Sequence, residues 1–166
     1  MKKLSILLVF MTLCAVNMMA QSTPWKIIDM EDVSRHGSNA EYDDETLTAT
    51  FKNDKDRWID LPGVKGDING HTMLHVKIMK ANCMLKFAVR YKDENGKAQQ
   101  AIAATCYSSM GKTIKKEKLL KIDLTNKGKI TEAMLKDVIG IRVAMAKGVE
   151  GKESPWEVTF GEVAIY

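Results

Sequence analysis

From residue 46 to the C-terminus, short runs of alternating apolar and polar residues follow one another, which is the pattern of half-buried β-strands. Pro62-Gly63 and Asn95-Gly96 are turn-forming pairs between runs. One short helix is expected over 131–136, where Thr131 can cap it. The strand-like runs are 46–51, 57–61, 71–79, 83–91, 99–107, 118–124, 138–146 and 155–166. These eight runs and one helical turn predict an all-β fold, an antiparallel β-sandwich with one short helix.

The Asn95-Gly96 turn joins two of these strands into a hairpin, and the length of the turn sets their register. A four-residue loop places Cys83 directly opposite Cys106, whereas a two-residue turn makes the two cysteines diagonal neighbours. In both registers the cysteines point into the core. The residues that share this face are Leu85, Phe87, Val89, Ile102 and Ala104. A cross-strand disulfide and two packed thiols therefore both stay open.

The opposite face of this hairpin combines small side chains with long polar ones. It is expected to carry Met84, Lys86, Ala88 and Arg90, then Gln99, Ala101, Ala103, Thr105 and Tyr107, and from the strand at 138–146 Arg142, Ala144 and Ala146. Alanine fills a strand poorly, so a row of alanines leaves a shallow floor between longer side chains. This surface is either an ordinary solvated face or a binding platform on the concave sheet.

The first twenty residues have the layout of a secretory signal peptide, with Lys2 and Lys3 before an apolar run over 4–16. We expect 1–20 to be removed and 21–166 to form a single β-sandwich domain in an exported protein, which would be periplasmic, on the cell surface or secreted. No other apolar run reaches the roughly 20 residues of a membrane helix. Leu13 stands where a lipoprotein signal has a small residue, which argues against lipidation of Cys14.

The charge balance excludes one class of partner. The chain has 25 Lys and Arg against 21 Asp and Glu, and removal of Lys2 and Lys3 leaves 25 − 2 = 23 basic residues, a net charge of +2. Nucleic-acid binding usually needs clustered Lys and Arg. We therefore expect no nucleic-acid partner.

Arg35-His36-Gly37 resembles the opening motif of the histidine phosphatases, in which the His takes the phosphoryl group. That chemistry also needs further arginines and a second His beside an acid. His71 and His75 are not followed by Asp or Glu, and the alternating helices of that family's α/β fold are not predicted here. The phosphatase hypothesis fails.

No other catalytic motif is present: the sequence lacks GxSxG, HExxH, a P-loop and CxxC. We therefore predict no catalytic residues and no enzyme. A glycosidase with two carboxylates on separate strands stays open as an alternative. The acids at Asp60, Asp67, Asp123 and Glu157, however, each have an ordinary turn or edge explanation.

Metals and aromatic residues add two weaker signals. Three scattered histidines do not make a transition-metal site, so no cofactor is expected, while 29–32 and 66–69 could hold a structural Ca²⁺ or simply form turns. Trp58 follows a charged loop and Tyr107 lies on the outward face. These two are the aromatic residues we expect to be exposed.

The order of elements resembles a carbohydrate-binding-module jelly roll, the galactose-binding-like fold. The resemblance is carried by WKIIDMED (25–32), RWIDLPG (57–63), KIDLTNKGKITEAMLKDVIGIRVAM (121–145) and PWEVTFGEVAIY (155–166). It covers most of the chain after residue 20 at the level of pattern. The resemblance implies an exported bacterial module that binds glycans without catalysis, on its concave face or loop tips, often with a structural Ca²⁺.

The sequence therefore favours non-catalytic binding of a polysaccharide or oligosaccharide. The expected ligand-binding residues are Arg90, Arg142, Gln99 and Tyr107, with Trp58 from a neighbouring loop. Companion glycan-degrading proteins are possible partners, and no membrane span is expected. The alternative is a structural or protein-interaction β-sandwich module with no glycan ligand, in which a sheet face or an edge strand docks the partner.

Overall fold

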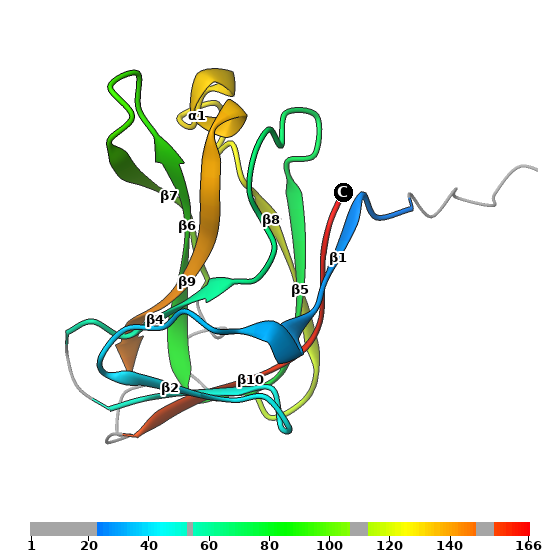
Figure 1. Cartoon of the computed structure of the whole chain (residues 1–166). Coiled ribbons are helices and arrows are strands. Elements are labelled where there is room, and N and C mark those ends of the chain that lie inside the picture. The colour runs from blue at the N-terminus through cyan, green and yellow to red at the C-terminus, as the bar shows by residue number, and fades with distance from the viewer. Residues whose placement is uncertain (1–22, 53–54, 107–112, 149–154) are drawn as a thin grey trace, which may run out of the picture.

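The computed structural model describes residues 23–52, 55–106, 113–148 and 155–166, and these residues form two antiparallel sheets packed face to face (Figure 1). In Figure 1, β6, β7 and β9 stand on the left and β1, β5 and β8 on the right, with α1 at the upper end. The strands are β1 (Lys26–Ile28), β2 (Ala40–Asp43), β3 (Thr48–Phe51), β4 (Trp58–Leu61), β5 (Met73–Ala81), β6 (Cys83–Lys92), β7 (Ala98–Cys106), β8 (Lys118–Asp123), β9 (Val138–Gly148) and β10 (Trp156–Ile165); the helices are the 3₁₀ turn η1 (Met30–Asp32) and α1 (Glu132–Lys136).

Each sheet mixes strands that are distant in sequence. The six-stranded sheet has the order β2-β3-β10-β5-β8, and β1 pairs with β10 as well. The four-stranded sheet has the order β4-β9-β6-β7. All recorded strand pairs are antiparallel. The predicted antiparallel β-sandwich of the jelly-roll class is therefore confirmed.

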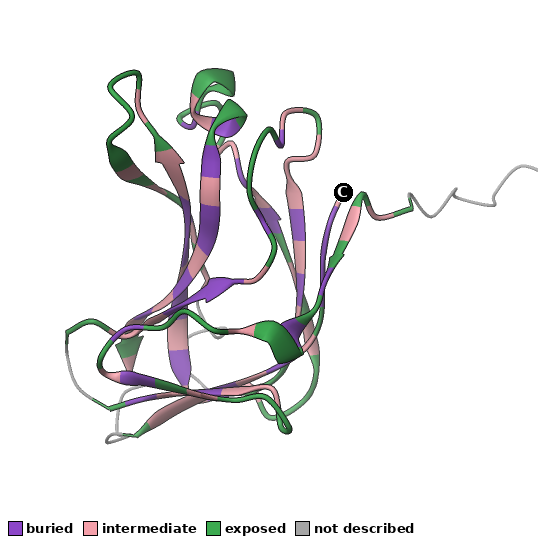
Figure 2. Ribbon diagram, viewed as in Figure 1, coloured by how far each residue is buried: buried purple, intermediate pink, exposed green. Residues whose placement is uncertain are grey.

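One hydrophobic core fills the space between the sheets. Alternation along each strand sends every second side chain inward, so buried residues (purple in Figure 2) recur along the strands while exposed ones (green) gather at turns. The largest fully buried side chains include Phe51, Phe87 and Phe160. As predicted, Leu85 and Val89 also lie in this core.

The predicted elements correspond to the observed ones within a few residues, with two omissions. β1 and β2 were not predicted as strands; they are short, with only three and four residues, and offer little alternation to detect. The helix at 131–136 is present as α1, but Thr131 makes no side-chain capping hydrogen bond at its N-terminus.

The register of the β6–β7 hairpin differs along its length because β7 contains a bulge. Leu85 lies opposite Cys106, which makes Cys83 and Cys106 diagonal neighbours, and both thiols are free. Beyond Phe87 the pairing shifts by one residue, so that Ala88 faces Ile102. A bulge inserts one extra residue into a strand, so the side chains beyond it point to the faces opposite to those that strict alternation predicts.

This bulge overturns part of the predicted face assignment. Ala103, expected outside, is 5% exposed and belongs to the core, whereas Ile102, expected inside, is 48% exposed. Gln99 pairs with Tyr91 and donates a hydrogen bond of 2.9 Å to Asp93. Gln100 rather than Gln99 shares the outer face with Arg90, which it lies directly opposite.

Within the described ranges, no helix is both long and apolar enough to cross a membrane.

The two core cysteines should differ in reactivity. Burial raises the pKa of the Cys83 thiol to about 12, and burial also raises the pKa of the half-buried Cys106 thiol. Alkylation requires the thiolate and access to it. We expect iodoacetamide to modify Cys106 slowly in the native protein and Cys83 only after unfolding, as measured by peptide mass mapping. Equal modification of both thiols in native protein, or a disulfide-linked peptide pair, would contradict this arrangement.

Candidate functional site

The outer face of the four-stranded sheet carries rows of side chains that cross all its strands. Residues directly opposite each other in antiparallel strands share a face, so the registers define the rows. One row is Trp58, Ala144, Lys86 and Thr105; the next is Asp60, Arg142, Ala88 and Ile102; the third is Gly140, Arg90 and Gln100. The expected combination of small and basic side chains is present on this face.

At the centre of this face, one carboxylate gathers several arginines. Arg142 donates to both oxygens of Asp60, from Nε to Oδ1 at 2.8 Å and from Nη2 to Oδ2 at 3.2 Å. Arg90 donates from Nη1 to Oδ2 at 2.6 Å. The Nε of Arg35 lies 4.0 Å from the same Oδ2. We call Asp60, Arg35, Arg90 and Arg142 the arginine cluster.

The strand register explains how these groups meet. Asp60 on β4 lies directly opposite Arg142 on β9, so their contact is a cross-strand pair. Arg90 lies on β6, two strands or about 10 Å away from β4, and its partner on the intervening β9 is Gly140. The long Arg90 side chain spans this distance and donates to Asp60 across β9. The charges are largely shielded: Asp60 is 6% exposed, and the side chains of Arg90 and Arg142 are 15% and 16% exposed.

Trp58 extends the cluster toward the loops. The guanidinium carbon of Arg142 lies 3.3 Å from the centroid of the Trp58 ring, a stacked cation–π contact. The Trp58 indole N–H donates to Asp56 at 2.6 Å. Ser38 donates to the other oxygen of Asp56 from both its hydroxyl and its backbone N–H, each at 2.7 Å. This network fixes the half-buried ring in orientation.

These hydrogen bonds also fix the charge of Asp56. The Ser38 hydroxyl, then the Ser38 N–H and the Trp58 indole, hold the pKa of Asp56 below its ordinary value. The carboxylate therefore stays ionised throughout the neutral range, and the hydrogen bond to the indole persists.

The segment Arg35-His36-Gly37 has a structural role at the edge of this site. The Asp60 N–H donates to the Arg35 carbonyl at 2.9 Å, and the Gly37 N–H donates to the Trp58 carbonyl at 2.8 Å, so the segment pairs with β4. Gly37 is needed for close approach, because a Cβ there would lie 2.0 Å from the Asp56 carbonyl oxygen. The motif that suggested phosphoryl transfer instead brings Arg35 to Asp60.

A polar pocket of about 270 Å³ adjoins the arginine cluster, with Arg35 and Asp60 in its wall. It is enclosed by the turn after β4 and by the bulged part of β9. The other lining residues are Asp32, Ser34, Leu61, Pro62, Gly63, Val64, Lys65, Ile139 and Gly140. The pocket is just below the usual size range of small-molecule sites, about 300–1,000 Å³, and it opens beside the buried charges.

Of the five predicted ligand-binding residues, the structure brings three together. Arg90, Arg142 and Trp58 share the outer face, whereas Gln99 points to the other side and Tyr107 lies outside the described residues. The predicted alanine floor is also partly filled. Ala88 is 1% exposed although it lies outside the inter-sheet core, so neighbouring side chains on the outer face cover it.

Asp60 and Arg35 are not among the predicted site residues. Asp60 has an ordinary turn or edge explanation in the sequence, but the alternation W-I-D-L places it on the same side as Trp58. The available signal for Asp60 was its negative charge in the middle of a strand, because that strand face was expected to carry two arginines. The partner of Arg35 depends on the pairing of 35–37 with β4, which the sequence pattern does not reveal.

The segments considered for calcium form local turns. Asp29 accepts a hydrogen bond from the Glu31 N–H, and Asp67 accepts one from the Asn69 N–H at 2.9 Å. Among the residues that the structure describes, no group of three or more His, Cys, Asp or Glu side chains is placed to hold a metal ion. A structural Ca²⁺ stays a prediction.

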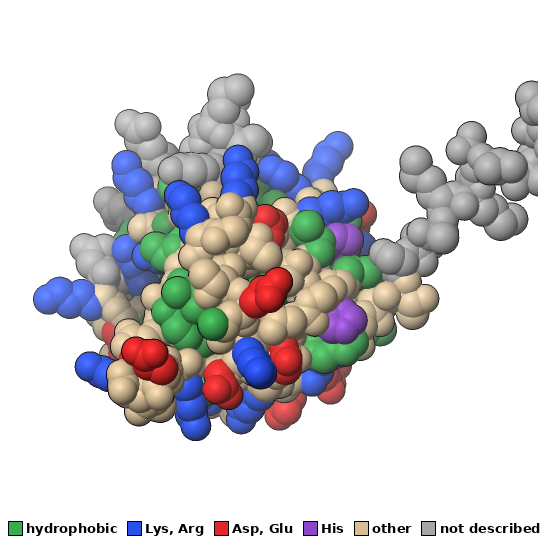
Figure 3. Space-filling model, turned by 90° about the horizontal axis from the view of Figure 1, so that it is seen from above, with side chains coloured by type: hydrophobic (Ala, Val, Ile, Leu, Met, Phe, Trp, Pro, Cys, Tyr) green, Lys and Arg blue, Asp and Glu red, His purple; other side chains and the backbone are tan. Residues whose placement is uncertain are grey.

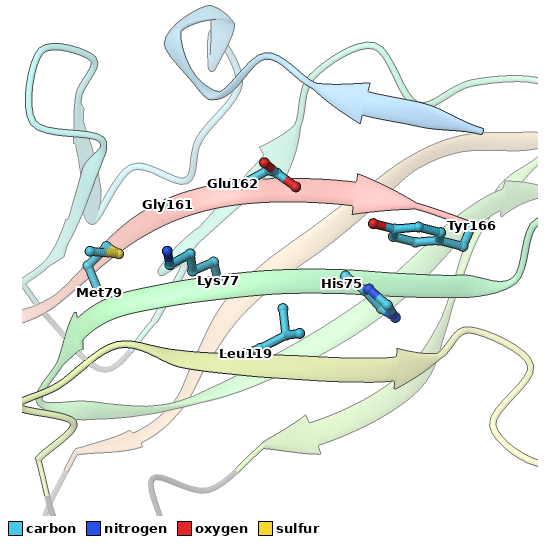
Figure 4. Close-up of a pocket in the computed structure, with 7 residues that line it drawn as sticks. All are labelled: His75, Lys77, Met79, Leu119, Gly161, Glu162 and Tyr166. Carbon is cyan, nitrogen blue, oxygen red and sulfur yellow. The ribbon is translucent and has the colours of Figure 1, made fainter. Parts of the chain in front are cut away.

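The six-stranded sheet presents a different outer face. Figure 4 shows His75, Lys77 and Met79 projecting from β5, beside Leu119 of β8 and beside Glu162 and Tyr166, which lie at the C-terminal end of the chain. These residues and Gly161 line a groove of about 340 Å³. The His75 and Tyr166 rings lie 4.3 Å apart, and Leu119 is 52% exposed. Trp25, 42% exposed and stacked on His71 at 4.6 Å, lies near this sheet.

The arginine cluster should stabilise the four-stranded sheet only while Asp60 is present to pair with the arginines. Replacing Asp60→Ala leaves two largely buried guanidinium groups without their carboxylate, and we expect a loss of about 3 kcal/mol in the free energy of unfolding. Replacing the triad with apolar residues (Asp60→Leu, Arg90→Met and Arg142→Met together) should stay within about 1 kcal/mol of the original protein. Urea unfolding of both variants measures the difference. A triple variant as unstable as Asp60→Ala would show that the charges are needed for folding.

Comparisons with known proteins identify the fold. No protein-family model matches the sequence, and no curated protein matches it. Among solved structures, the chain is similar to the family 30 carbohydrate-binding module of the cellulosomal cellulase Cel9D-Cel44B of Clostridium thermocellum, with a TM-score of 0.51, 14% sequence identity, and coverage of 87% of this chain and 94% of that one. It is also similar to CpGH89CBM32-4 of Clostridium perfringens, solved in complex with GlcNAc-alpha-1,4-galactose, with a TM-score of 0.43, 14% identity, and coverage of 89% and 99%. The protein therefore has the β-sandwich fold of carbohydrate-binding modules.

Proposed function

We propose that this protein binds a glycan without catalysis, at Trp58 and the arginine cluster on the outer face of the four-stranded sheet. The observation that carries the proposal is the fixed stack of Trp58 on Arg142, with Arg90 held beside it by Asp60. The fold of carbohydrate-binding modules supports the proposal. Fold alone does not define a ligand, so the chemistry of this face has to identify it.

A sugar ring needs two kinds of contact, and this site offers both. The apolar face of a pyranose packs on an aromatic ring, and Trp58 is half-buried, so part of its indole stays accessible. Hydroxyl groups need hydrogen-bond partners, and a guanidinium carries five N–H donors. Asp60 occupies two N–H donors of Arg142 and one of Arg90, which leaves 5 − 2 = 3 and 5 − 1 = 4 for other partners. The site can therefore contact a ring face and read its hydroxyls.

The same geometry argues for binding rather than hydrolysis. A glycosidase needs two carboxyl groups that are free to transfer a proton or attack the sugar. Both oxygens of Asp60 accept hydrogen bonds from arginines, and both oxygens of Asp56 accept hydrogen bonds from Ser38 or Trp58. These two carboxylates position other side chains, which is the role expected in a binding site.

The proposed setting follows from the function. A polysaccharide ligand would be met outside the cytoplasm, in agreement with the expected signal peptide at 1–20. Glycan-degrading proteins acting on the same polymer are the companions that a non-catalytic module would serve.

The test compares the half-buried Trp58 with the exposed Trp25. Trp58→Ala should reduce glycan retention at least tenfold because it removes the ring surface and the support of Arg142. Trp25→Ala removes a ring near the other sheet and should leave retention unchanged. Affinity electrophoresis against a panel of soluble neutral and acidic polysaccharides measures both variants beside the original protein.

Three results are informative. Loss of retention with Trp58→Ala alone supports the proposed face. Loss with Trp25→Ala alone would move the glycan site to the six-stranded sheet. No retention of the folded original protein on any polymer would contradict glycan binding.

One observation favours the second candidate, a protein-interaction module. Met79 and Leu119, 39% and 52% exposed, line the groove of the six-stranded sheet, and exposed apolar surface is typical of docking sites. Self-association is the form of this function that can be measured without another protein. If it occurs, sedimentation should show a dimer that Leu119→Lys dissociates.

A further inference from the structure

We infer that the site selects an anionic glycan, whose carboxylate or sulfate groups pair with the arginine cluster. This inference rests on the proposed function and names the chemical class of its ligand. It follows from the charge of the outer face of the four-stranded sheet, from the exposure of its members, and from the way in which Asp60 divides its hydrogen bonds.

The outer face has more positive than negative groups. Around the arginine cluster the cations are Arg35, Lys86, Arg90 and Arg142, and the carboxylates that contact this network are Asp56 and Asp60. Four positive and two negative charges leave an excess of 4 − 2 = +2.

This excess is local rather than part of a general basic surface. On the face shown in Figure 3, which views the molecule from above, basic side chains (blue) and acidic ones (red) are interspersed. On the six-stranded sheet, two cations contact acids: Lys77 contacts Glu117 at 2.9 Å, and Lys80 contacts Glu157 at 3.8 Å. The arginine cluster instead shares one carboxylate among its members.

The shared carboxylate leaves the cluster electrostatically incomplete. Arg90 and Arg142 are about 15% exposed and have only Asp60 as a charged hydrogen-bond partner in the described structure. Shielded charge without a counterion is unfavourable, because the surrounding protein solvates it less well than water does. A ligand carboxylate or sulfate would supply the missing charge, and an arginine fork binds such groups in a bidentate manner.

Arg35 provides an entrance for this anion. Its side chain is 57% exposed, its Nε lies 4.0 Å from Asp60, and it lines the 270 Å³ pocket together with Lys65 and Asp32. Asp60 is then a positioning residue: it orients the guanidinium groups and is not expected to contact the ligand. A neutral sugar could use the hydrogen-bond donors of this site but would leave its excess charge uncompensated.

The test uses polymers that differ in charge but share a backbone. Polygalacturonate should be retained at least tenfold more strongly than its fully methyl-esterified form, and added salt should weaken the binding. Dextran sulfate compared with dextran separates the two sources of negative charge. Preference for polygalacturonate alone assigns a uronate, and preference for dextran sulfate alone assigns a sulfate ester.

A pair of matched variants locates the effect. Arg35→Gln should lower the ratio of retention on polygalacturonate to retention on the methyl ester about two- to fivefold, because one accessible cation is lost. Lys121→Gln removes one exposed charge from the six-stranded sheet and should leave this ratio unchanged. An equal fall of this ratio in both variants would show that the preference depends only on the net charge of the protein. That result would overturn the inference. The urea midpoint of each variant checks that the fold is intact.

The remaining outcomes separate the inference from the proposed function. Equal retention on the charged and esterified polymers, lost in Trp58→Ala, would overturn the anionic ligand and leave glycan binding intact. Absence of retention on all four polymers, and on the wider neutral panel, would overturn both.

Discussion

The pairing of Asp60 with Arg90 and Arg142 is the interaction on which the outer face of the four-stranded sheet depends. One carboxylate, 6% exposed, connects three neighbouring strands, β4, β9 and β6. Each arginine alone would be a long, mobile side chain. Held by Asp60, both lie across the sheet, and Arg142 supports the Trp58 ring from below. The network thus converts a sheet surface into a rigid arrangement of donors beside an aromatic ring, and such preorganisation reduces the entropic cost of binding.

The two sheets of the sandwich serve this arrangement differently. The shared core requires only that inward positions be apolar, and it places no demand on the outward positions of either sheet. One outer face therefore holds a network of arginines around Asp60, while the other holds Leu119 and Met79 beside paired rings. A chain with 14% identity to a carbohydrate-binding module can keep the fold and carry a different set of outward residues. This is why the ligand has to be argued from Trp58 and its neighbours.

The sequence predicts the fold well because period-2 alternation is a local property. It identified eight of the strands, the short helix and the inward positions Leu85, Phe87 and Val89. It failed where one residue is inserted: the bulge in β7 places Ala103 in the core and exchanges Gln100 for Gln99 beside Arg90. Nothing in the alternating QQAIAATC sequence marks this position. The site was predicted only in part, for a related reason. Strand parity gave the face of Arg90 and Arg142, but the contacts of Asp60 and Arg35 depend on which strands become neighbours, and that is not a local property.

The measurement that tests the account most directly is an NMR titration of the protein with soluble oligogalacturonate, observing the indole N–H signals. The chain has three tryptophans, and each lies in a different environment: Trp58 is hydrogen-bonded to Asp56, Trp25 stacks on His71, and Trp156 packs against the core. The account predicts that the Trp58 indole signal shifts in a saturable manner while the other two stay in place. A saturable shift of Trp25 with an unchanged Trp58 signal would contradict it, because the ligand would then lie against the six-stranded sheet.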